Sequence, residues 1–156
     1  MSDLIVHHFD PSPFAERVRL ALGLKNLDWM SVQIPMIMPK PDLTALTGGY
    51  RKTPVLQIGA DVYCDTRRIA LELEKRHPSP PLFPAGTTGL ALALARWSDE
   101  FLFPPGAALS MSTNTDLPEP VLKDRLAFFD FLDEQDLQSP TDRFYAQFTA
   151  GLQQLE

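Results

Sequence analysis

The chain of 156 residues has a single cysteine, Cys64, which rules out an intrachain disulfide and a metal site built from cysteines alone. Its three histidines, at positions 7, 8 and 77, lack the spacing typical of metal ligands. No apolar run reaches the ~18 residues that a membrane span requires. The N-terminus also lacks the basic segment and apolar stretch of a signal peptide. These absences predict no bound metal, no membrane association and a reducing, cytoplasmic location.

Basic residues are scarce in the second half of the chain. Residues 1–85 contain 10 Lys or Arg and 9 Asp or Glu, whereas residues 86–156 contain 4 and 11. The net charge of −6 argues against nucleic acid as a partner, because affinity for a phosphate backbone comes from Lys and Arg. We expect a small anionic ligand to prefer the first half.

Proline, in contrast, is abundant: the 15 prolines are about twice the average usage of ~5%. Four of them fall within Pro78–Pro84, a density that neither a helix nor a central strand tolerates. We therefore predict two domains, residues 1–77 and 87–156, joined by a proline-rich linker at residues 78–86.

The first half has the pattern of an α/β domain. A strand over Leu4–Phe9, a helix that starts at Ser12-Pro13 and ends near Gly23, and a strand over Leu27–Ile34 predict a right-handed parallel βαβ unit. Gly59-Ala60-Asp61 separates two further short strands at hairpin spacing. The remaining expected elements are a short helix, the two hairpin strands and a last helix, at residues 42–46, 55–58, 62–64 and 66–77.

The second half has the 3.6-residue periodicity of helices only. We expect a helix over 88–103 that stops or kinks at Pro104-Pro105-Gly106, a polar loop at 110–118 and a helix over 121–135. Ser139-Pro140-Thr141-Asp142 then predicts another helix start. That helix runs to Glu156 without a cap, so we expect the chain to be a truncated version of a two-domain protein.

Three short motifs lie where strands meet helices or loops, on one expected edge of the sheet. Ser12-Pro13 places a hydroxyl at a helix N-terminus, which suits an anion such as a thiolate, although simple helix capping also explains it. Thr53-Pro54 precedes a strand, where proline marks either a cis bond or an ordinary trans strand entry. Asp65-Thr66 begins a helix and suits an amino acid head group, with capping again the alternative.

Together these motifs resemble the glutathione S-transferase (GST) family. Ser12–Leu20 is close to the omega-type active-site segment, whose first position is a catalytic cysteine. Lys52–Leu56 matches the cis-proline motif, and Asp65–Ile69 matches the motif that holds the γ-glutamyl group. The resemblance implies a thioredoxin-like N-terminal domain followed by an all-α C-terminal domain, and a homodimer.

The resemblance also implies roles for individual residues. Ser12 would donate a hydrogen bond to the glutathione thiolate, activating it for attack on a hydrophobic electrophile. A mixed disulfide through this position is excluded, because it holds serine in place of cysteine. The implied glutathione-binding residues are Phe14, Lys40, Thr53, Pro54, Asp65 and Thr66.

A second hypothesis is a non-catalytic module of this fold that binds ligands or proteins. The Arg67-Arg68 pair motivates it, because Arg68 stands where the family usually has a small residue; it either pairs with a carboxylate or narrows the site. Cys64 is expected to be a small buried hydrophobe, with a place near the pocket beside Asp65 as the alternative. His7 and His8 alternate in direction, so at most one points into the core. Trp97 and Phe101 are expected to pack in the helical core, with an electrophile pocket as the alternative.

Overall fold

The computed structural model describes residues 3–114, 116–138 and 142–155. The chain divides into two compact units, one ending at Thr88 and the other beginning at Gly89.

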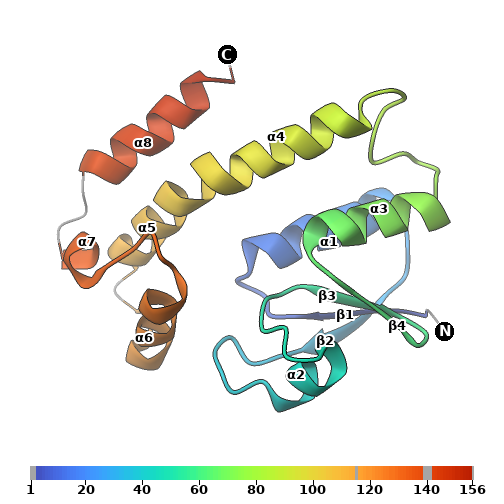
Figure 1. Ribbon diagram of the computed structural model, residues 1–156, viewed down its shortest axis with the longest axis horizontal. Helices are drawn as coiled ribbons and strands as arrows, with labels where there is room; N and C mark the ends of the chain where they lie inside the picture. Colours follow the sequence, from blue (N-terminus) through green and yellow to red (C-terminus); the bar gives the residue numbers. More distant parts are fainter. Residues whose placement is uncertain (1–2, 115, 139–141, 156) are drawn as a thin grey trace. The chain divides into compact units, whose positions relative to one another are not determined.

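The first unit contains a four-stranded mixed sheet in the order β2-β1-β3-β4 (Figure 1). β1 is parallel to β2 and antiparallel to β3, and β3 is antiparallel to β4. The predicted βαβ unit and hairpin are therefore confirmed. The strands are β1 (Leu4–His8), β2 (Met30–Gln33), β3 (Val55–Ile58) and β4 (Asp61–Cys64).

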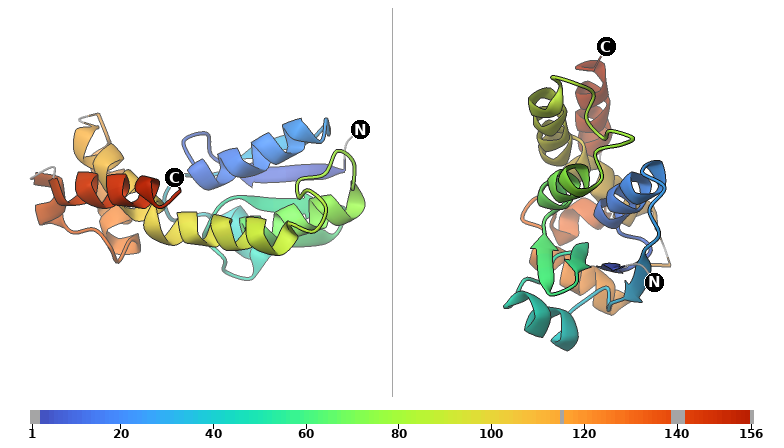
Figure 2. Two further views of the ribbon diagram at one scale, coloured as in Figure 1. Left: turned by 90° about the horizontal axis from the view of Figure 1, so that it is seen from above. Right: turned by 90° about the vertical axis from the view of Figure 1, so that its right-hand side faces the viewer.

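Three helices flank this sheet: α1 (Pro13–Leu24), α2 (Pro41–Thr47) and α3 (Thr66–Arg76). Helices α1 and α3 lie side by side over one face, and α2 lies on the other (Figures 1 and 2). The core lies beneath α1 and α3, where apolar residues of both helices meet the inward-facing positions of β1 and β3. Its buried members are Leu4, Val6, Val18, Leu22, Leu56, Ile69 and Leu73.

The second strand is shorter than predicted. β2 pairs only over Met30–Gln33, because Leu27 and Trp29 pack against the core before the chain joins the sheet. Asn26 has φ 50°, a left-handed conformation that asparagine tolerates and that turns the chain out of α1.

The second unit is entirely helical in its described residues. This composition, after a thioredoxin-like first unit, confirms the predicted fold class. Its core is a cluster around Ala108, Leu132 and Phe144. The helices are α4 (Thr88–Phe101), α5 (Phe103–Thr113), α6 (Glu119–Phe128), α7 (Glu134–Gln138) and α8 (Asp142–Gln153).

The predicted bounds of a loop and of a helix are wrong in this unit. The prolines at 104 and 105 only interrupt the helix, because they occupy the first turn of α5, where a missing N–H costs nothing. As a result α5 continues to Thr113, and the predicted loop at 110–118 was wrong over its first four residues. The predicted helix over 121–135 is broken at Phe129, whose backbone is extended (φ −98°, ψ 117°). The break turns the Phe129 ring against Phe103 and Phe131.

The expected burial of the α4 stripe is also wrong. Helix α4 has no fully buried residue, and Phe101 is 53% exposed while it stacks on Trp97. Helices α5 and α8 supply Ala108 and Phe144 to the core instead.

The predicted helix start at Ser139-Pro140-Thr141 and the chain end at Glu156 lie outside the described residues. None of the helices within the described ranges is long and apolar enough to cross a membrane.

Candidate functional site

Ser12 connects the end of β1 to the start of α1. Its Oγ accepts a hydrogen bond from the Ala15 amide at 3.2 Å, so Ser12 is the N-cap of α1. The side chain is almost fully buried, and its own hydroxyl hydrogen is left to donate. The predicted cap is confirmed. The same geometry places the Ser12 hydroxyl at the N-terminus of α1.

Thr53 and Pro54 lie beside this loop. The Thr53–Pro54 bond is cis and Pro54 is fully buried. In the antiparallel pairing His7 faces Val55, so the residues before Val55 lie toward the end of β1 that leads to Ser12. The Thr53 hydroxyl donates to the His7 carbonyl at 3.2 Å, which fixes that position.

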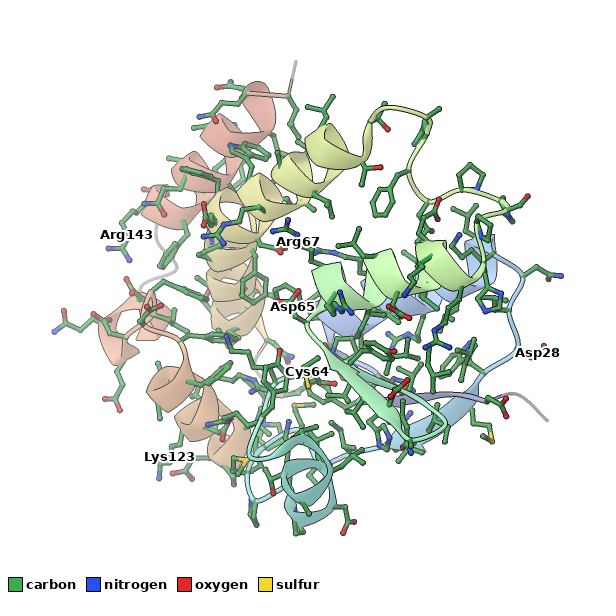
Figure 3. The ribbon with its side chains drawn as sticks, turned by 45° about the vertical axis from the view of Figure 1, so that its right-hand side comes forward. Asp28, Cys64, Asp65, Arg67, Lys123 and Arg143 are labelled. Atoms are coloured by element: carbon green, nitrogen blue, oxygen red, sulfur yellow. The ribbon has the colours of Figure 1, made fainter. Side chains whose placement is uncertain are left out.

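Asp65 and Thr66 reach the same edge through β4, because Val55 also pairs with Cys64. Asp65 is exposed, with φ 74°, and its carboxylate accepts the Arg67 amide at 2.8 Å as the cap of α3. Figure 3 shows Cys64, Asp65 and Arg67 in succession where β4 leads into α3. The Thr66 hydroxyl lies 3.5 Å from Nη1 of Arg17, which links the first turns of α3 to α1.

Arg17 is a residue whose place in the site was not predicted. Its guanidinium lies over the ring of Phe14, 5.5 Å from the centroid, while it contacts Thr66. The signal was present in the sequence, because residues three apart on a helix share a face. Phe14 is half-buried beside this cation.

Lys40 precedes α2 and is buried. Its Nζ donates to the Arg51 carbonyl at 3.1 Å and lies 5.3 Å from the centre of the Phe9 ring. The structure therefore places Lys40 against the β1–α1 loop (residues 9–12), and its ammonium donates a hydrogen bond to a backbone carbonyl.

Tyr50 and Cys64 lie next to Asp65. Burial and the negative charge of Asp65 raise the pKa of the Cys64 thiol, and the same two causes raise the pKa of Tyr50. The Cys64 side chain is half-buried. It is protonated at neutral pH and supplies no ready thiolate. No sequence pattern pointed to Tyr50, which reaches this place through the loop after Gly48-Gly49.

The open question about Arg68 has an answer in the structure. Its guanidinium lies 3.7 Å from the Glu72 carboxylate and 5.8 Å from the centre of the Tyr63 ring. Arg68 therefore pairs with a carboxylate along α3, and its side chain is 61% exposed.

Of the two histidines on β1, His8 points into the core and is 2% exposed. Across the described ranges, no three His, Cys, Asp or Glu side chains are grouped to hold a metal ion.

These features define a thioredoxin-like domain with three motifs gathered at one sheet edge. Residues 6–81 match the family model of the glutathione S-transferase N-terminal domain. A GST-like protein from Pseudomonas syringae is 53% identical, over 80% of this chain and 44% of its own, with a TM-score of 0.64. The chain belongs to the glutathione S-transferase family.

Two further relatives are informative. A rice GST solved in complex with glutathione is 26% identical, with 69% of this chain and 52% of its own covered and a TM-score of 0.60. FtsZ-localized protein A from Caulobacter vibrioides is 30% identical over 99 residues, 60% of this chain and 43% of its own. The chain thus spans less than half the length of the Pseudomonas and Caulobacter relatives.

Proposed function

We propose that the first unit binds glutathione and that Ser12 activates its thiol for attack on a hydrophobic electrophile. One observation carries the proposal: Ser12, the cis Thr53–Pro54 bond and Asp65-Thr66 converge on one edge of the sheet from three separate parts of the chain. The rice relative in complex with glutathione supports the choice of ligand. The proposal includes a cytoplasmic homodimer, as the family resemblance implies.

Each subsite has a physical task. The Thr53 backbone pairs with the cysteinyl part of the tripeptide, and Pro54 holds that backbone in place. The Asp65 carboxylate takes the γ-glutamyl ammonium. Thr66 and the first turn of α3 take the γ-glutamyl carboxylate, because a helix N-terminus favours an anion.

Ser12 acts on the thiol by donating its hydroxyl hydrogen to the sulfur. The Ala15 amide already donates to the same oxygen, which polarises the hydroxyl and strengthens it as a donor. Lowering the thiol pKa from about 8.5 to about 6.5 requires roughly 2.7 kcal/mol. A charge-assisted hydrogen bond of about 1.5–3 kcal/mol, together with the positive end of α1, supplies this amount.

The test measures the ultraviolet absorbance of bound thiolate and the turnover of a panel of electrophiles. We expect Ser12→Ala to abolish the thiolate signal near neutral pH and to reduce turnover about a hundredfold, equivalent to the 2.7 kcal/mol above. Ser110→Ala, at an exposed position on α5, is the matched control. If Ser12→Ala retains both signals, the role assigned to Ser12 is wrong.

The relative from Caulobacter favours a second candidate function, a non-catalytic module that assembles with FtsZ. Titration calorimetry with glutathione and co-sedimentation with FtsZ polymers separate the two candidates. Heat of glutathione binding followed by turnover supports the transferase. Folded protein that gives no heat and sediments with FtsZ polymers supports the assembly module.

A further inference from the structure

His8 is a buried titratable group for which the proposed chemistry has no use. Its Nε2 lies 2.8 Å from Oγ of Ser31, and its Nδ1 lies 2.9 Å from Nη1 of Arg19. A guanidinium has donors only, so Nδ1 must accept this hydrogen bond. The ring is therefore neutral, with its hydrogen on Nε2 directed to Ser31.

Arg19 uses its other nitrogens on the segment that leads to Ser12. Its Nη2 donates to the Asp10 carbonyl at 2.9 Å, two residues before Ser12. Its Nε donates to the Glu16 carboxylate at 2.7 Å. One guanidinium thus joins His8 at the end of β1, the backbone of the β1–α1 loop and the first turns of α1.

The loop is also held from β2. Nε2 of Gln33 donates to the Asp10 carboxylate at 3.0 Å and lies 3.4 Å from Nε2 of His8. Within the loop, the Ser12 amide donates to the Phe9 carbonyl at 3.2 Å. Asp10 is therefore held by two hydrogen bonds, from Arg19 to its carbonyl and from Gln33 to its carboxylate. Both donor side chains also lie next to the His8 ring.

We propose that Arg19 and neutral His8 are positioning residues for the β1–α1 loop, and that protonation of His8 releases Arg19 and loosens the loop around Ser12. A protonated ring would present an N–H to a guanidinium that also has only donors, so the bond between them breaks. The consequence for ligand binding rests on the proposed function. The positioning of the loop does not depend on it.

The charges around His8 set the pH range. Arg19, itself paired with Glu16, faces it from α1 and Asp10 faces it from the loop. Ser31 and Gln33 face it from β2, and the Trp29 ring from the residue before β2. Burial and the Arg19 charge lower the pKa of His8 below 6.5, and the Asp10 carboxylate opposes them. His8 is therefore neutral at pH 7 and takes up its proton only as the pH falls below 6.5.

The first experiment follows the His8 ring and the Asp10 and Ser12 amides by NMR between pH 7.5 and pH 4.5. We expect both amides to shift with the same midpoint as the His8 ring. His8→Gln retains an acceptor and a donor but no titration, so it should abolish this step. His7→Gln, on the opposite face of β1, is the matched control and should preserve it. The proposal is overturned if the wild-type amides do not follow the ring, or if the step survives in His8→Gln.

The second experiment measures the affinity for S-methylglutathione, whose sulfur cannot ionise. We expect wild-type affinity to fall about tenfold from pH 7.5 to pH 5.0 and His8→Gln affinity to change little. At pH 7.5, Arg19→Gln should bind about tenfold more weakly, and Arg19→Lys should recover part of that loss. Wild-type affinity in both Arg19 variants would contradict the positioning role. If the wild type does not bind the analogue, the proposed function fails and the amide titration alone decides this proposal.

Discussion

Nζ of Lys25 lies 2.7 Å from Oε2 of Glu74, and the Lys25 side chain is completely buried. The same ammonium donates to the carbonyls of His77 and Pro80, and Glu74 accepts the Leu82 amide at 2.9 Å. A single ion pair therefore fastens the end of α1, helix α3 and the start of the proline-rich segment together. Proline cannot supply an N–H to hold such a segment, so side chains do so instead.

Replacing Lys25 with Met should lower the free energy of unfolding by about 3 kcal/mol, because it leaves the Glu74 carboxylate without its cationic partner and the carbonyls of His77 and Pro80 without this donor. The double variant Lys25→Met/Glu74→Met should recover part of this loss, since two apolar side chains pack without a stranded charge. Urea unfolding measures both. Lys75→Met, at an exposed position on α3, is the control and should change little. A Lys25→Met protein as stable as the control would contradict the role given to this pair.

The same pair predicts how stability depends on acid. Burial alone would raise the pKa of Glu74, but the hydrogen bonds from Lys25 and Leu82 outweigh it and lower the pKa below 4.5. The unfolded chain then binds the proton first, so stability is present above about pH 4.5 and is lost as the pH falls through the folded pKa. Glu74→Gln should be less stable at pH 7 and should lose less stability between pH 5 and pH 3. Thermal unfolding at each pH measures the loss of stability. Equal losses of stability in Glu74→Gln and in the wild type would contradict this prediction.

The first unit could be predicted from sequence because its signals are local. Ser12-Pro13 and Asp65 are helix caps, and Gly59-Ala60-Asp61 sets a hairpin, so each boundary depends on a few neighbouring residues. The pairing of His7 with Val55 and of Val55 with Cys64 then places all three motifs at one edge of the sheet. The contacts of Arg17 with Thr66 and of His8 with Ser31 could not be predicted in the same way, because these partners are distant in the sequence.

The second unit was predicted less well for a physical reason. The apolar spacing of residues 121–135 fits one helix, yet Phe129 and Phe131 gain more by packing with each other and with Phe103 than by continuing it. Tertiary packing overrides helix propensity there. Proline at 104 and 105 was ambiguous from sequence, because the residue stops a helix in its interior and favours one in its first turn.

Cys64 should react slowly with alkylating reagents at pH 7, because only its thiolate is nucleophilic and its pKa is raised by burial and by Asp65. Asp65→Asn removes the second cause while keeping a good helix cap, so it should lower the pKa and accelerate alkylation several-fold. Mass spectrometry of iodoacetamide-treated protein over pH 7–10 measures the rates. Asp61→Asn, at the other end of β4, is the control. Equal rates in the two variants would show that Asp65 does not govern the thiol.

Among the described glycines of the second unit, Gly151 leaves the least room for a side chain. A Cβ at this position would lie 2.7 Å from Cδ2 of Leu102, so Gly151 lets α8 pack tightly at the start of α5. Gly151→Val should destabilise the unit by about 1–3 kcal/mol through overpacking, even though valine has a better helix propensity than glycine. Gly89→Ala, where a Cβ meets nothing within 4 Å, should cause no loss. Restoring stability with Gly151→Val/Leu102→Ala would identify the Leu102 contact as the cause, whereas a Gly151→Val protein as stable as Gly89→Ala would show that the packing relaxes freely.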